Sequence, residues 1–119
     1  MHEALQNQIE DLCDKIHNLN EAKTHILFAE YGLTSQETRS KIEKETSLLG
    51  RAYKNITLEE SELKNKIFNT IKEFEQKRGR ESVVLFLVNL IKQNPWAYKT
   101  VNLVTSIFEE KKDPILITA

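Results

Sequence analysis

The sequence has few of the residues that end or bend regular structure, with three glycines and two prolines among 119 residues. This scarcity favours a small number of long elements, and helices are the elements that fit it. The single cysteine, Cys13, excludes an intramolecular disulfide and a multi-cysteine metal site, and it fits a reducing compartment. No apolar run reaches the roughly 18 residues that a membrane span needs. The start of the chain mixes acidic with apolar residues, unlike a signal peptide, so we expect a cytoplasmic protein.

Motifs of catalysis and of cofactor binding are also missing. Histidines at positions 2, 17 and 25 do not have the spacing of metal ligands. Glycines at 32, 50 and 79 are isolated, so they form no phosphate-binding loop. Cys13 has no histidine placed as its base. We therefore expect no enzymatic activity, no metal, no cofactor and no small-molecule substrate.

The net charge of −1 argues against a globally basic nucleic-acid binder, but it leaves local basic patches open. Two clusters of basic side chains stand out, one along a predicted helix face and one around Gly79. Glutamates interrupt or flank both clusters, which favours a solvated face over a phosphate-binding one. Nucleic acid stays an alternative partner, with contacts from Lys41, Lys44, Arg51, Lys54, Lys77, Arg78 and Arg80.

Apolar residues in the first two thirds of the chain follow heptad spacing, with steps of three, four or seven residues. Such spacing predicts long helices with coiled-coil character. Gly32 and the link that follows it predict an antiparallel hairpin over 1–78. A break near Asn55–Thr57 competes with one continuous second helix. The predicted oligomer seam consists of Leu5, Ile9, Leu12, Ile16, Leu19, Ile26, Ile42, Leu49, Ile56 and Leu63.

The stretch "ESVVLFLVNLIKQNPW", residues 81–96, holds most of the remaining apolar surface. We predict a helix that begins with Ser82 as N-cap and ends before Pro95, followed by a last helix to about residue 111. A helix that is apolar all round must be covered on most sides. The stretch is therefore either the core of a small bundle or, in part, an interface. The residues predicted to contact a partner are Phe86, Leu90, Trp96 and Tyr98.

These observations predict an all-α fold with one domain over 1–119. The hairpin at 1–78 would be packed on, or followed by, a two-helix unit at 82–112, with a tail at 113–119. The function that fits best is a non-enzymatic protein–protein interaction module, an oligomerising adaptor or regulator, with a homodimer favoured. Two alternatives stay open, a small nucleic-acid-binding regulator and a chaperone for a secreted or virion protein. The sequence does not decide whether the seams close within one chain or between chains.

Overall fold

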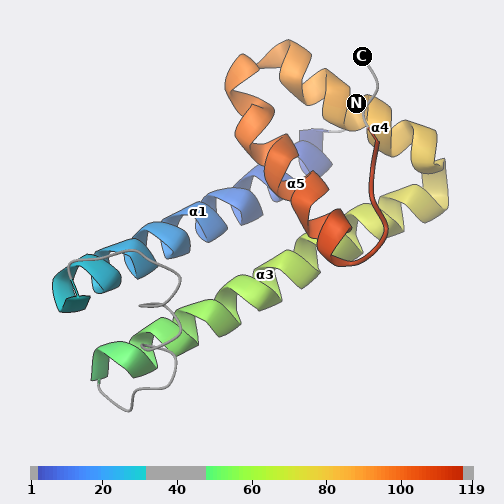
Figure 1. Ribbon diagram of the computed structural model, residues 1–119. Helices are drawn as coiled ribbons and strands as arrows, with labels where there is room; N and C mark the ends of the chain where they lie inside the picture. Colours follow the sequence, from blue (N-terminus) through green and yellow to red (C-terminus); the bar gives the residue numbers. More distant parts are fainter. Residues whose placement is uncertain (1–2, 32–47, 117–119) are drawn as a thin grey trace. The chain divides into compact units, whose positions relative to one another are not determined.

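The computed structural model describes residues 3–31 and 48–116, and all regular structure in these ranges is helical (Figure 1). This confirms the predicted all-α fold. Over the same ranges, no helix combines the length and the apolarity needed to cross a membrane. In chain order the elements are α1 (Glu3–Tyr31), α3 (Leu48–Arg78), α4 (Arg80–Gln93), the short 3-10 helix η1 (Pro95–Ala97) and α5 (Tyr98–Glu110).

Helix α3 is continuous through the position at which a break was one of the two predicted alternatives. It runs for 31 residues and includes Asn55–Thr57 without interruption. The hydroxyl of Thr57 donates a hydrogen bond to the carbonyl of Tyr53, one turn earlier, at 3.0 Å. A threonine in the middle of a helix can satisfy its side chain in this way, so it need not start a new helix. The continuous alternative is therefore the one that the structure shows.

The chain divides into two compact units. The larger unit comprises residues 1–13 and 64–119, and the smaller unit comprises residues 14–63, so that α1 and α3 contribute to both. In the smaller unit, Leu27 and Tyr53 are buried against each other. Lys23 forms an ion pair of 3.1 Å with Glu60. Moving forward along α1 from position 23 to 27 thus means moving backward along α3, which makes the two segments antiparallel within this unit.

The core of the larger unit contains one face of α4, together with residues of α3 and α5. Two tilted aromatic pairs lie in this unit, Phe68 with Phe108 at 4.7 Å between ring centroids and Phe74 with Phe86 at 5.9 Å. Aromatic contacts of this geometry stabilise a core beyond the area that they bury. The buried residues of α3, α4 and α5 here are Ile67, Ile71, Val83, Phe86, Leu87, Leu90, Thr100, Val101, Val104, Ile107 and Phe108.

Gly79 separates α3 from α4, and the prediction of Ser82 as the N-cap of α4 is wrong. The backbone of Gly79 has φ 90° and ψ 162°, a conformation that is essentially restricted to glycine. Helix α4 begins directly after it, at Arg80. The hydroxyl of Ser82 donates instead to the carbonyl of Arg78 at 2.8 Å, so it lies inside the helix and caps nothing.

The end of α5 has the hydrogen-bond pattern of a Schellman motif. The amide of Lys112 donates to the carbonyl of Glu109 at 3.0 Å, and the amide of Asp113 donates to the carbonyl of Phe108 at 2.9 Å. Lys112 takes the left-handed conformation that this motif requires, with φ 58°. This conformation costs a residue with a Cβ about 1 kcal/mol, whereas glycine adopts it freely.

Lys112→Gly should therefore stabilise the protein, by about 0.5–1 kcal/mol. The gain comes from removing the left-handed strain, and part of it is offset by the greater freedom of glycine in the unfolded chain. Urea unfolding followed by circular dichroism would measure the change. Lys99→Gly, within α5, is the matched control, and it should lower the free energy of unfolding by about 1 kcal/mol. A loss of stability in Lys112→Gly would contradict the prediction.

Candidate functional site

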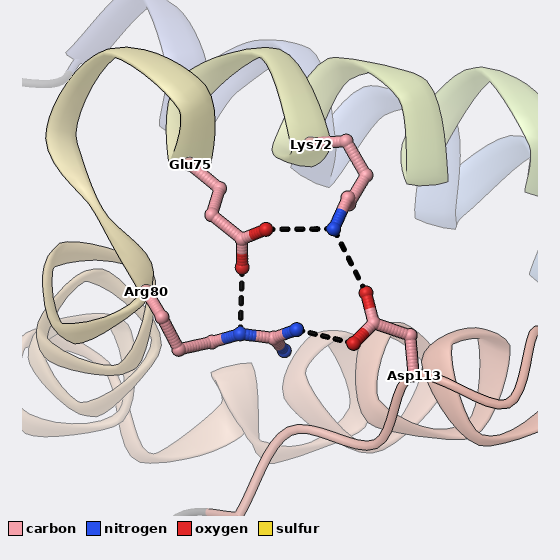
Figure 2. A network of polar contacts seen from close by, with 4 residues as sticks. All are labelled: Lys72, Glu75, Arg80 and Asp113. Carbon is pink, nitrogen blue, oxygen red and sulfur yellow. Dashed lines mark hydrogen bonds and ion pairs between the residues drawn. The ribbon is translucent and has the colours of Figure 1, made fainter.

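A network of four charged side chains holds the start of α4 (Figure 2). The Nζ of Lys72 donates to Oε1 of Glu75 at 2.7 Å and to Oδ2 of Asp113 at 2.9 Å. The Nε of Arg80 lies 2.6 Å from Oε2 of Glu75, and its Nη2 donates to Oδ1 of Asp113. Cations and carboxylates therefore alternate around a closed ring. The ring ties the first residue of α4 to α3 and to the segment that follows α5.

Pairing in this network shifts two pKa values away from their ordinary ranges. The hydrogen bond to Glu75, followed by that to Asp113, raises the pKa of Lys72 against the opposing effect of burial. The hydrogen bond from Lys72 is the largest cause of the lowered pKa of Asp113, which burial opposes and Arg80 reinforces. Both shifts favour the charged forms. Charge–charge pairing therefore holds α4 in place throughout the neutral range.

The outer side of α4 carries a stripe of four residues at steps of four, three and four: Glu81, Leu85, Val88 and Lys92. At 3.6 residues per turn this spacing places all four on one face, opposite the buried face of the helix. Leu85 is 57% exposed, and Glu81 and Lys92 are also exposed. Val88 is half-buried. We call this set the outer stripe of α4.

Two further apolar residues border the outer stripe on one side. Val84 is half-buried, and Ile91 is 36% exposed. They lie seven residues apart, which is two helical turns, so they run parallel to the stripe. Helix α4 therefore presents an apolar band along its outer side in addition to the face that it buries in the core.

On the other side of the outer stripe lies a groove of about 660 Å³ between the first turns of α1 and helix α4, within the larger unit. Its apolar lining includes Phe86 and Leu90, and its polar lining consists mostly of carboxamide side chains. Leu85 belongs both to the groove and to the stripe. The residues that line the groove are Glu3, Gln6, Asn7, Ser82, Leu85, Phe86, Asn89, Leu90 and Gln93.

The four predicted partner contacts fall into two pairs. Trp96 and Tyr98 are exposed, at 74% and 45%, and are open to a partner. Phe86 and Leu90 are buried, so they offer a partner only the part of their surface that lines the groove. The outer stripe was not among the contacts predicted from the sequence. Its residues follow helical spacing in the sequence. Apolar residues occur on every side of this helix, however, so the sequence did not indicate which face would be exposed.

The predicted oligomer seam is largely covered within one copy of the chain. Ile9, Leu12 and Ile16 are buried. Half-buried positions are Leu5, Leu19, Ile26, Ile56 and Leu63. Ile42 and the side chain of Leu49 lie outside the described residues. The use of this seam between copies stays a prediction.

The basic residues of the nucleic-acid alternative are spread over different surroundings. Arg51, Lys77 and Arg78 are exposed and Lys54 is half-buried, while Lys41 and Lys44 lie outside the described residues. The Nζ of Lys77 lies 3.7 Å from Oε1 of Glu73. Arg80 is held by two carboxylates in the network. Pairing of this kind reduces the charge available to phosphates, which weakens this alternative.

Within the described ranges, no group of three or more histidine, cysteine, aspartate or glutamate side chains is placed to hold a metal ion. Cys13 is buried. Comparison of the chain with models of protein families, with curated proteins and with solved structures found no match.

Proposed function

We propose that this chain is a non-enzymatic protein–protein interaction module of the oligomerising adaptor or regulator kind. The outer stripe of α4 and the adjoining groove would form its docking surface. The observation that carries this proposal is the exposed Leu85, which lies between Val88 and the groove on one helix. Contiguous exposed apolar surface with a polar rim is typical of sites that bind other proteins.

The way in which α4 is held supports this use. Its inner face is anchored by the buried Val83 and Leu87, and its first residue is fixed by the charged network. A surface that is already ordered loses little conformational freedom when a partner binds. Helices that present residues at steps of three and four are a common element of protein recognition.

We also propose a cytoplasmic location, which the lone buried cysteine supports.

Site-specific photo-crosslinking in cells would test the proposal. A photoreactive amino acid would replace Leu85 and, as the matched control, Lys66, an exposed residue of α3. We expect one discrete protein adduct at position 85 that is absent at position 66. The adduct would be identified by mass spectrometry, re-formed from purified components, and lost when Val88→Asp is added. The absence of any adduct specific to position 85 would overturn the proposal.

A further inference from the structure

We infer that the partner on the outer stripe of α4 is a second copy of this chain, whose α4 lies antiparallel across a two-fold axis. This inference rests on the proposed function, namely that the stripe docks a protein, and it identifies that protein. The observation behind it is the order of charges along the stripe. The apolar pair Leu85 and Val88 lies in the middle, with Glu81 at one end and Lys92 at the other.

The stripe is self-complementary under a two-fold rotation. Glu81 precedes Leu85 by four residues, and Lys92 follows Val88 by four residues, so both charges are equally far from the centre. In a two-fold interface, if residue i of one copy contacts residue j of the other, then j contacts i as well. An antiparallel pair therefore places Leu85 on the partner's Val88 and Glu81 on the partner's Lys92, each contact occurring twice.

The parallel arrangement is disfavoured by the same charges. It would place Glu81 against the partner's Glu81 and Lys92 against the partner's Lys92, and like charges at such positions repel. The steps of four, three and four are those of a coiled-coil seam, in which apolar side chains of two helices interlock. Val84 and Ile91 widen the apolar contact on one side of the seam. The charge order thus selects both the partner and its direction.

The size of the stripe sets the expected strength of the dimer. Helix α4 has 14 residues, and its apolar contact consists of two central layers with one bordering strip. Such an interface falls in the small class, which is typical of weak, concentration-dependent association. We therefore expect a reversible dimer in the micromolar to millimolar range rather than a permanent one. Association of this strength can be regulated by the concentration of the chain.

Sedimentation equilibrium on the full chain, over micromolar to millimolar concentrations, tests the inference with charge reversals. Glu81→Lys and Lys92→Glu should each weaken the dimer by about tenfold, because both ion pairs of the homodimer become repulsive. An equimolar mixture of the two variants should recover the affinity of the original chain. In the mixed dimer, each reversed residue again faces a residue of opposite charge.

Control variants separate this effect from changes in folding. Each single reversal also places an unfavourable charge at one end of α4, but the mixture contains the same two variants, so its recovery cannot come from helix stability. Glu59→Lys, an exposed position in α3, should leave the dimer unchanged. Leu85→Asp should abolish the dimer while the helical circular dichroism persists.

The outcomes also separate this inference from the proposed function. A chain that stays monomeric at millimolar concentration, or a mixture no tighter than the single variants, would overturn the antiparallel dimer. If position 85 nevertheless crosslinks to a different protein, the interaction module stands and only its self-association fails. If position 85 forms no adduct and the chain is monomeric, both proposals fail. A dimer with recovery in the mixture, and with position 85 crosslinked between two copies, supports both.

Discussion

Phe108→Ala is expected to lower the free energy of unfolding by about 3–5 kcal/mol, a large fraction of the total for a domain of this size. The side chain is fully buried in α5, and its ring centroid lies 4.7 Å from that of Phe68. The guanidinium of Arg80 lies 5.9 Å from the same ring. Truncation therefore removes contacts to α3 and α4 together and leaves a cavity that the surrounding structure fills only in part. Urea unfolding by circular dichroism would measure the loss.

Trp96→Ala is the matched control for this prediction. It also removes a large aromatic side chain from the C-terminal part of the chain, but Trp96 is 74% exposed. Surface substitutions of this kind change stability by about 0.5 kcal/mol or less. Equal losses in Phe108→Ala and Trp96→Ala would contradict the core described for the larger unit.

Much of the fold was predictable because a few residues decide it locally. Gly79 and Pro95 each mark a helix boundary through their own backbone chemistry, whatever surrounds them. The heptad spacing kept its phase across Asn55–Thr57, and α3 is continuous there. Ser82 shows the limit of such reasoning. Its position after Gly79 suited an N-cap, but the helix begins earlier, at Arg80, with Gly79 itself in the N-cap position. The amide of Val83 donates to the carbonyl of Gly79 at 3.4 Å, which is the first hydrogen bond of that helix.

The candidate site was harder to predict, because the packing of other helices decides which face of α4 is exposed. Leu85 and Leu87 are chemically identical and two residues apart, yet one is 57% exposed and the other fully buried. Leu87 lies on the face of α4 that belongs to the core, which also contains Ile71 of α3 and Val104 of α5, whereas Leu85 lies on the opposite face. The charged network also depends on tertiary structure, since its members Arg80 and Asp113 are 33 residues apart in the sequence. Composition and periodicity carry no information on such pairings.

Arg80→Met is expected to lower the free energy of unfolding by about 1–2 kcal/mol. The substitution keeps an apolar side chain near Phe108 but removes the cation that bridges Glu75 and Asp113. The side chain of Glu75 is only 15% exposed, so it would keep one charged partner, Lys72, in a place that water hardly reaches. Lys77→Met is the matched control, because its pair with Glu73 is exposed on both sides and contributes almost nothing.

The cost of Arg80→Met should depend on pH in a way that follows from the shifted pKa values. The pKa of Asp113 is lowered from 3.8, so its pairing stabilises the folded chain above that value and is lost as the pH falls through the lowered pKa. The pKa of Lys72 is raised from 10.5, so its contribution persists through neutral pH and disappears only as the pH rises through the raised value. Thermal unfolding of the original chain and of Arg80→Met should therefore show a difference in stability that is constant near neutral pH and becomes smaller in acid. A difference that stays constant at a pH well below 3.8 would mean that Arg80 stabilises the fold through packing on Phe108 and not through its carboxylate partners.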